Sequence, residues 1–394
     1  MSKRALFVTI GLLMMVSLVA ACAAPAPAAP TTAPTAPLAA TSVPAANSAP
    51  AAVAPSTKVS LDMTAAKVRY GSITGIAYPT FIAAQEKGFF TKENLTVEVN
   101  MFNGSGPVTD AIAAGNIDIG NTTPSSGLLA SVKGAKVIQV SGHEATFIDK
   151  SGKSWEAAYL IVRSGEGIQK LADLKGKKVA INDIGSLYNY TLRAQMLALK
   201  IDPDKDMTIV PVPFSQMPAA LMQKQVDAAI VNADGYIQAQ SLGKVDVIAT
   251  HTSLEGDDFS LSSSMGVNTD YLQKNPDVVV RFLRALIESR QWLQNDVEKN
   301  NGQGIIDIVM KSMKYSKEKA TSLYDTRAAY YGKDLDFANL LDIPVRLMNR
   351  QYEILKANNL IKSDVPDDYN KAVDIKYLKE AFASLGIKWD DSKH

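Results

Sequence analysis

Runs of residues with a strand-like hydrophobic pattern alternate with runs of helical period along most of the chain. In the first series, strands are expected at 68–71, 95–102, 117–120 and 137–140, and helices at 79–87, 107–114 and 124–133. The helix at 79–87 is marked at both ends, because Pro79 opens it and Gly88 follows it. Strands that alternate with helices in this way predict a parallel sheet covered by helices on both faces.

A second series of the same kind begins at Tyr159. Strands are expected at 159–163, 178–181, 208–212, 228–231, 245–249 and 264–267, with helices at 168–174, 186–199, 217–224 and 237–242. From 276 the pattern is helical nearly to the end of the chain. We therefore expect an α/β protein in which 58–162 plus 263–394 form a first lobe and 163–262 form a second. Two crossings of the chain between the lobes would make a hinge.

The first 57 residues follow neither pattern. Lys3 and Arg4 precede a charge-free, largely apolar run at 5–21, and Cys22 follows two alanines. The run is short for a spanning helix, and the small residues at its end fit a signal-peptidase site. This segment resembles a bacterial lipobox, which implies that 1–21 is a lipoprotein signal peptide and that Cys22 becomes the acylated first residue. An ordinary signal peptide and an uncleaved anchor are the alternatives.

Residues 22–57 consist almost entirely of Ala, Pro, Thr and Ser. Such a stretch cannot bury a core, and its prolines stiffen it into extended segments. It is therefore expected to be a disordered tether that holds the folded part away from a membrane. The lipid anchor on Cys22 would place the protein at the extracytoplasmic face of the cell membrane.

Composition and charge exclude several classes of function. The chain has 41 Lys+Arg against 40 Asp+Glu, three histidines and one cysteine. One thiol rules out an internal disulfide, and Cys22, His143, His251 and His394 lack the spacing of zinc ligands, so no metal site is expected. A formal charge of +1 without a basic run argues against nucleic acid as a partner.

Nucleotide-binding and hydrolase motifs are incomplete or absent in the sequence. Gly104-Ser105-Gly106 follows a strand and opens a helix, but position 109 is Thr109, so the dinucleotide fingerprint is incomplete. Gly152-Lys153-Ser154 imitates the end of a P-loop, yet Phe147 stands where the first glycine belongs. No G-x-S-x-G elbow is present. The sequence therefore supports no catalytic residue and no cofactor.

A resemblance over the whole pattern remains, carried by short segments in a fixed order. These are Glu-Lys-Gly-Phe-Phe at 86–90, Ala-Ala-Gly-Asn-Ile-Asp-Ile-Gly at 113–120, Leu-Lys-Gly-Lys-Lys-Val-Ala at 174–180, Gln-Val-Asp-Ala-Ala-Ile-Val at 225–231 and Gly-Val-Asn-Thr-Asp-Tyr-Leu at 266–272. In this order they resemble the substrate-binding proteins of ABC importers for sulfonates, nitrate, taurine, thiamine pyrimidine precursors and riboflavin.

The resemblance implies a two-lobed, periplasmic-binding-protein-like fold of type II, with a hinge and a cleft between the lobes. It also implies a small-molecule ligand, a membrane permease with its ATPase subunit as partners, and a monomer. Ligand would bridge the lobes and favour the closed form, which would then dock on the permease.

The loops expected at the cleft lack positive charge. They follow the carboxyl ends of the strands, at 72–78, 103–107, 120–126, 141–144, 182–188, 213–217, 232–236 and 256–260, and none contains Lys or Arg. They do contain carboxylates and aromatic rings. The candidate ligand-binding residues are Tyr78, Asn103, Ser105, Thr123, Asp183, Tyr188, Phe214, Asp234 and Tyr236. Asp183 and Asp234 are equally compatible with capping a helix or turn.

Aromatic side chains suit a flat ring held by stacking, and Asn, Asp and hydroxyl groups suit its polar atoms. The expected ligand is therefore a heteroaromatic nutrient, with riboflavin first and a thiamine pyrimidine precursor second. A sulfonate, taurine or nitrate is the alternative, since helix starts near Ser105, Thr123 and Ser186 attract anions without side-chain charge.

Two alternatives belong to other classes of function. One is an exported enzyme, because some relatives make a thiamine pyrimidine with a pyridoxal cofactor on a lysine; the absence of lysine from the expected cleft loops argues against it. The other is a sensory or interaction lipoprotein that keeps the fold without transport.

Overall fold

The computed structural model describes residues 61–76, 78–148, 154–331 and 341–389. The predicted signal peptide, Cys22 and the tether lie outside these residues. In the described part of the chain, no helix has both the length and the apolar character that crossing a membrane requires.

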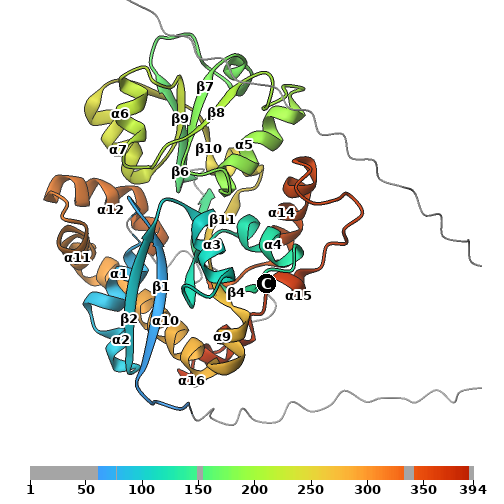
Figure 1. Cartoon of the computed structure of the whole chain (residues 1–394). Coiled ribbons are helices and arrows are strands. Elements are labelled where there is room, and N and C mark those ends of the chain that lie inside the picture. Colours follow the sequence, from blue (N-terminus) through green and yellow to red (C-terminus); the bar gives the residue numbers. More distant parts are fainter. Residues whose placement is uncertain (1–60, 77, 149–153, 332–340, 390–394) are drawn as a thin grey trace, which may run out of the picture. The chain divides into compact units, whose positions relative to one another are not determined.

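The strands form two separate sheets (Figure 1). The first has the order β2-β1-β3-β11-β4-β5. Its strands are β1 (Ala66–Ile73), β2 (Leu95–Phe102), β3 (Ile119–Thr122), β4 (Val137–Ile148), β5 (Ser154–Trp155) and β11 (Phe259–Asn268). The second has the order β10-β6-β9-β7-β8, formed by β6 (Ala158–Arg163), β7 (Lys178–Ile181), β8 (Thr208–Pro211), β9 (Ala228–Asn232) and β10 (Val245–Thr250). We call each sheet with its helices a lobe.

Both sheets are mixed, so the expectation of parallel sheets is wrong in part. β1 pairs in parallel with β2 and β3, and β7 pairs in parallel with β8 and β9. The strands at which the chain enters each lobe from the other run the other way: β11 is antiparallel to β3 and β4, and β6 is antiparallel to β9 and β10. A strand that enters a sheet from the cleft must run opposite to strands that end there.

Both crossings lie a few residues earlier in the sequence than the expected boundaries. β6, expected in the first lobe up to 162, pairs within the second sheet, and β11 joins the first sheet from Phe259 onward. The chain thus passes between the lobes just after Trp155 and just before Phe259.

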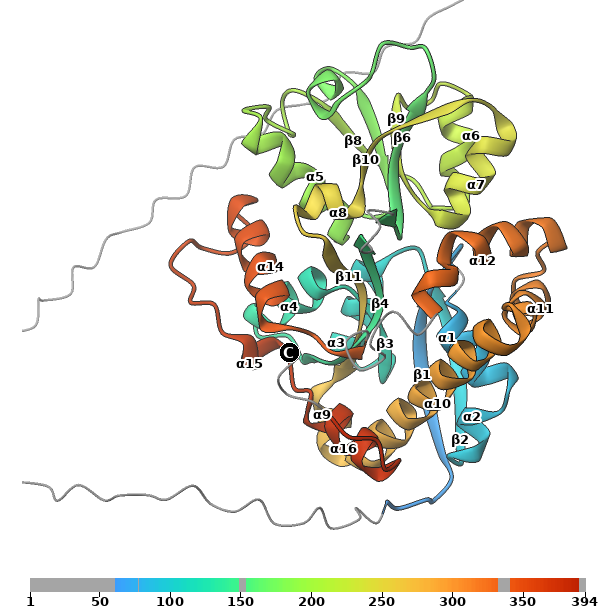
Figure 2. The same cartoon turned by 180° about the vertical axis from the view of Figure 1, so that it is seen from behind.

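Helices cover the sheets and build most of the C-terminal third (Figures 1 and 2). Their bounds are α1 (Pro79–Glu86), α2 (Phe89–Lys92), α3 (Ser105–Ala113), α4 (Pro124–Val132), α5 (Leu187–Ala198), α6 (Met217–Met222), α7 (Ala233–Leu242), α8 (His251–Glu255), α9 (Thr269–Lys274), α10 (Pro276–Asn300), α11 (Gln303–Met313), α12 (Lys317–Tyr331), α14 (Val345–Ala357), α15 (Tyr369–Ala372) and α16 (Lys376–Ser384). A 3-10 turn occupies Leu171–Leu174.

Stacked aromatic rings fix the first lobe's core. The Tyr70 ring on β1 lies 4.2 Å from that of Phe81, centroid to centroid, and the Phe90 ring lies 5.0 Å from that of Phe282 on α10. Gly88, at φ 77°, ends the first helix so that Phe90 turns into this core. Long α10 thereby anchors the helical tail to the sheet.

Helix α14 contacts the second lobe as well. Arg350 donates through Nε to the Glu255 carbonyl at 3.0 Å, and the Asn358 amide that follows α14 donates to the Tyr190 carbonyl at 2.9 Å. The tail therefore packs on both lobes.

Candidate functional site

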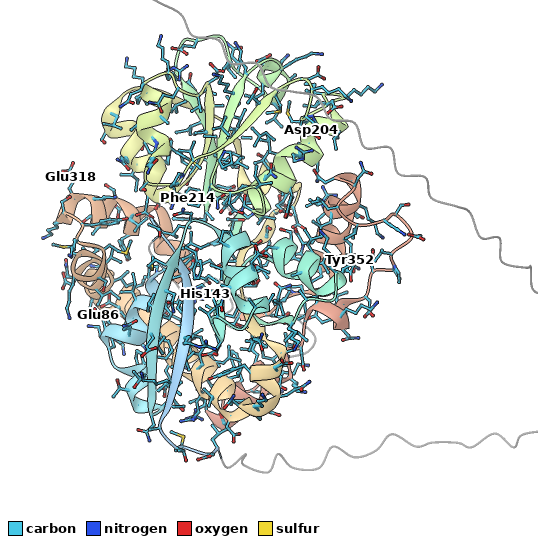
Figure 3. The ribbon with its side chains drawn as sticks, viewed as in Figure 1. Glu86, His143, Asp204, Phe214, Glu318 and Tyr352 are labelled. Carbon is cyan, nitrogen blue, oxygen red and sulfur yellow. The ribbon has the colours of Figure 1, made fainter. Side chains whose placement is uncertain are left out.

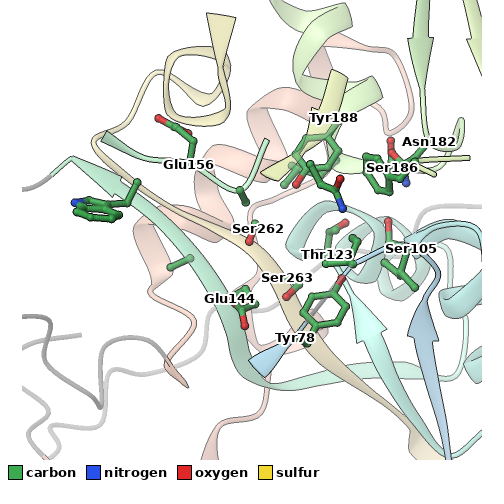
Figure 4. A pocket seen from close by; sticks show the side chains of 18 of the residues that line it. Tyr78, Ser105, Thr123, Glu144, Glu156, Asn182, Ser186, Tyr188, Ser262 and Ser263 are labelled. Carbon is green, nitrogen blue, oxygen red and sulfur yellow. The ribbon is translucent and has the colours of Figure 1, made fainter. Parts of the chain in front are cut away.

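A narrow cavity lies between the two lobes (Figure 4). Its cavity volume is about 40 Å³. The lining residues are Ile73, Ile76, Tyr78, Ser105, Thr123, Glu144, Ala145, Trp155, Glu156, Ala157, Asn182, Ser186, Leu187, Tyr188, Phe214, Asn232, Ser262, Ser263 and Thr326. This volume is well below that of typical sites for drug-sized ligands, so the lobes enclose little free space in this closed arrangement.

Four helices begin at this cavity, two from each lobe. Ser105 is the first residue of α3, and Thr123, Ser186 and Asn232 are the N-caps of α4, α5 and α7. Each follows a strand whose carboxyl end points at the cleft, which is where open α/β sheets bind ligands. The three cap side chains accept hydrogen bonds from backbone N–H groups of their own helices.

Asn232 also joins the lobes directly. Its Nδ2 donates to the Gly75 carbonyl of the first lobe at 2.8 Å, while its Oδ1 accepts from the Gly235 N–H at 2.9 Å. Gly75 has φ 79°, a left-handed conformation that favours glycine. The structure is therefore that of a closed cleft.

Aromatic side chains from both lobes supply much of the cavity wall. Tyr188 and Phe214 of the second lobe meet edge to face, with centroids 6.2 Å apart, and Tyr188 also lies edge-on to His251 at 5.4 Å. Tyr78 of the first lobe tilts against His143 at 5.3 Å. Figure 3 labels Phe214 and His143, one in each lobe. Rings held in this way present fixed faces to a ligand.

The charged side chains in the lining are acids. Glu144 and Glu156 line the cavity, and no Lys or Arg is among its described lining residues. Glu156 is held at the start of α8, where it accepts from the Thr252 N–H at 3.0 Å and from the Thr252 hydroxyl. Burial lowers the pKa of neighbouring His143 to about 3, with the Arg290 charge adding to the effect, so this ring is neutral. The cavity therefore disfavours a ligand that relies on positive side chains.

Among the buried polar atoms of the lining are serine and asparagine oxygens that have no hydrogen-bond partner among the described residues. They are Ser105 Oγ, Ser263 Oγ and Asn182 Oδ1, in residues that are 1%, 3% and 5% exposed. Figure 4 shows Ser105 and Asn182 toward one end of the cavity and Glu156 toward the other. Buried polar groups are normally satisfied, so these atoms are suited to bind a ligand or water.

The structure separates the residues expected at the site into two groups. Tyr78, Ser105, Thr123, Tyr188 and Phe214 line the cavity. The other four do not line it, and they have different surroundings: Asn103 is exposed, Tyr236 stacks on Tyr159 at 4.4 Å, Asp234 lies buried in the first turn of α7, and Asp183 lies at the start of α3.

Several lining residues were not among the candidates. Trp155, Glu156, Ser262 and Ser263 belong to the strands and the segment that carry the chain between the lobes. The expected boundary at 162/163 placed the first crossing after Trp155 and Glu156. Ser262 and Ser263 lie at the expected second boundary but outside the expected cleft loops, of which the nearest was 256–260. The serine run at 262–264, next to an apolar strand, was an available signal. In the described part of the chain, no group of His, Cys, Asp and Glu is arranged to hold a metal ion.

Known proteins share this sequence pattern and fold. The family described as NMT1/THI5 like matches residues 77–299. A putative binding protein of Brucella abortus is 27% identical over 239 residues, which are 59% of this chain and 67% of that protein. The nitrate/nitrite binding protein NrtA of Nostoc sp. is 27% identical over 277 residues, which are 64% of this chain and 58% of that protein.

A solved structure confirms the fold. The periplasmic aliphatic sulphonate binding protein SsuA of Escherichia coli aligns over 79% of this chain and 91% of its own, with a TM-score of 0.56 and 20% sequence identity. The two-lobed periplasmic-binding-protein fold expected from the sequence is therefore confirmed.

Proposed function

Because the chain belongs to the NMT1/THI5-like family and is an ABC-type substrate-binding protein of the sulfonate and nitrate group, we propose that it captures a flat heteroaromatic nutrient between its lobes. Riboflavin is the first candidate and a thiamine pyrimidine precursor the second. The observation that carries this proposal is the lining itself: aromatic rings and two carboxylates, with no Lys or Arg among the described lining residues.

The rings in the cavity wall support a flat ligand. Tyr188, Phe214 and Tyr78 line the cavity, and aromatic walls suit a ring that stacks against them. Such stacking contributes about 0.5–1.5 kcal/mol per pair beyond the burial of apolar surface.

Polar groups around the cavity are suited to hydrogen-bond the edge of such a ring and its substituents. Glu144 and Glu156 accept hydrogen bonds from ring N–H or amino groups, and the Ser105 and Ser263 hydroxyls have unused bonding capacity among the described residues. Several hydroxyl and amide side chains together favour a ligand that carries hydroxyl groups, as riboflavin does.

The second candidate ligand is a sulfonate, taurine or nitrate. The convergence of four helix starts on the cavity supports it, because helix N-termini attract anions. Glu144 and Glu156 oppose it. An exported enzyme that binds pyridoxal is weaker still, because no lysine is among the described lining residues.

Delivery would follow from closure of the lobes. Ligand shifts the equilibrium toward the closed form only by binding it more tightly than the open form, and the closed form would dock on a permease with its ATPase. The acylated Cys22 would hold the protein at the extracytoplasmic membrane face as a monomer. A sensory or interaction lipoprotein would share all of this except the permease.

A thermal-shift panel tests the ligand class. The full chain, with Cys22→Ser to avoid acylation, is heated with riboflavin, thiamine, its pyrimidine precursor, taurine, an alkanesulfonate and nitrate in turn. A rise in Tm with a ring compound and none with the anions is expected. A rise with an anion alone would refute the proposal, and an absorbance band from a lysine aldimine on adding pyridoxal phosphate would favour the enzyme.

A further inference from the structure

The start of helix α3 has no capping side chain of its own. Its N-cap is Gly104, in an extended conformation at φ −178°, so the first backbone N–H groups of the helix need another acceptor. The neighbouring carboxylate is that of Asp183, which comes from the loop after β7 in the other lobe.

The fit between Asp183 and this helix start is tight. A Cβ atom added at Gly104 would lie 1.8 Å from Asp183 Oδ2, and one added at Gly106 would lie 2.7 Å from Oδ1. Backbone N–H groups of Gly185, Gly106 and Ser105 lie close enough to lower the pKa of this carboxyl, although Asp183 Oδ1 makes no hydrogen bond of standard geometry among the described residues. The Asn182 amide donates to Oδ2 at 2.8 Å. Gly104 and Gly106, whose nucleotide motif is incomplete, have no side chain in the way and so allow the carboxylate to approach.

We propose that Asp183 caps helix α3 from the opposite lobe, and that this contact forms only when the cleft closes. Asp183 is then a positioning residue: it does not line the cavity, but it holds the two lobes in the arrangement that does. It also occupies the α3 helix start, which would otherwise be open to an anionic ligand. The link to ligand capture rests on the proposed function, whereas the contact itself does not.

Closure through this contact depends on pH. Burial raises the pKa of the Asp183 carboxyl to about 6, against the opposing effect of the Gly185, Gly106 and Ser105 N–H groups. Of the described titratable groups, Asp110 on α3 adds to the rise, and Tyr190 on α5 also faces the carboxyl. In the open form the carboxyl would be in water with its ordinary pKa, so the closed form binds the proton more tightly. The equilibrium constant for closing is therefore expected to be about tenfold larger at about pH 5 than at about pH 8.

Spin labels in each lobe report closure without any ligand. Met101 on β2 and Leu242 on α7 are 55% and 52% exposed, and Cys at both positions, with Cys22→Ser, gives one distance between the lobes in the full chain. Double electron–electron resonance then measures, at about pH 5 and about pH 8, the fraction of molecules in which the two labels are at the shorter distance. Wild type is expected to show a larger closed fraction at the lower pH.

Variants separate the cap from the charge. D183N keeps a neutral acceptor, so it should close equally well at both pH values. D183A should close less than wild type at about pH 5, where the Asp183 carboxyl is protonated, and should show no pH dependence. G104A should also close less, because its methyl group meets the carboxylate, and the double variant G104A/D183A should match D183A alone.

Matched controls complete the test. Gly243→Ala adds the same methyl group to a backbone that is also extended, and Asp364→Asn removes an exposed carboxylate elsewhere. Both should behave as wild type. Closure of D183A equal to that of wild type at about pH 5, a pH profile that survives in D183N, or the absence of a short distance in wild type would overturn the proposal. Failure of the ring compounds to bind would leave these ligand-free distances unaffected.

Discussion

Asn232 of the second lobe donates from Nδ2 to the carbonyl oxygen of Gly75 in the first lobe at 2.8 Å. The same side chain caps helix α7 through Oδ1, which accepts from the Gly235 N–H. One residue therefore stabilises a helix within its lobe and a contact between the lobes, and substitutions can separate these two effects.

Asn232→Ser is expected to keep the cap and lose the contact between the lobes. A serine hydroxyl accepts from the helix N–H but is too short to reach Gly75. Ligand affinity should fall by roughly three- to tenfold, as expected for one hydrogen bond worth about 1 kcal/mol. Tm without ligand should stay close to that of wild type.

Asn232→Ala serves as the comparison, because it loses the cap as well. Its affinity should fall as in Asn232→Ser, while the free energy of unfolding drops by a further ~1 kcal/mol. Calorimetric titration and urea unfolding measure the two quantities. Equal unfolding free energies for the two variants would contradict the dual role.

Tyr188→Ala is expected to weaken binding of a ring compound by roughly 10- to 100-fold. The tyrosine ring forms part of the cavity wall, and the substitution removes both its stacking energy and its buried area. Tyr188→Phe retains the wall and should remain much closer to wild type. Fluorescence titration with riboflavin measures both affinities. An unchanged affinity in Tyr188→Ala would show that the ring binds elsewhere or not at all.

Glu144→Gln is expected to change selectivity between ligands. Removing a buried negative charge from the lining lowers the repulsion of anions, so the affinity for taurine or nitrate should rise relative to that for a ring compound. Competition titrations against a bound ring compound measure this ratio. Exposed Glu353, on the outer surface of α14, provides Glu353→Gln as a control that should leave it unchanged.

His143 is expected to reduce stability in acid. Its folded-state pKa of about 3 lies below the ordinary value of 6.5, so the unfolded chain binds the proton more readily. Its contribution is complete above about pH 6.5 and is lost as pH falls, by about 2 kcal/mol on reaching about pH 5. His143→Gln cannot take up this proton. Urea unfolding at about pH 7 and about pH 5 should show a smaller loss in the variant.

Asp183 acts in the opposite direction over part of the same range, since its pKa is raised. The comparison of His143→Gln with wild type removes this common effect. Identical losses of unfolding free energy in the two proteins would mean that His143 is not buried and neutral in the folded state.

Local patterns predict the parts of the site that depend on a strand followed by a helix. Ser105 and Thr123 follow β2 and β3 at the starts of α3 and α4, so their place at the cleft follows from the alternation alone. The loops that follow β7 and β8 predict Tyr188 and Phe214 at the cleft in the same way.

Those patterns do not predict residues whose position depends on tertiary contacts. Trp155 and Glu156 enter the cavity because β4 and β5 carry the chain toward the second lobe, and hydrophobic periodicity does not show where a chain changes sheet. Asp183 follows β7 as expected, but its position depends on the other lobe, since its carboxylate lies against Gly104. The role of a cleft residue is set by closure as much as by its own element.

Isothermal titration of the full chain carrying Cys22→Ser with riboflavin, the thiamine pyrimidine precursor and taurine is the most direct measurement. A cavity lined by aromatic rings and acidic side chains predicts saturable one-to-one binding of a heteroaromatic compound and no heat from taurine at the same concentration. Saturable binding of taurine, with no heat from either ring compound, would contradict it.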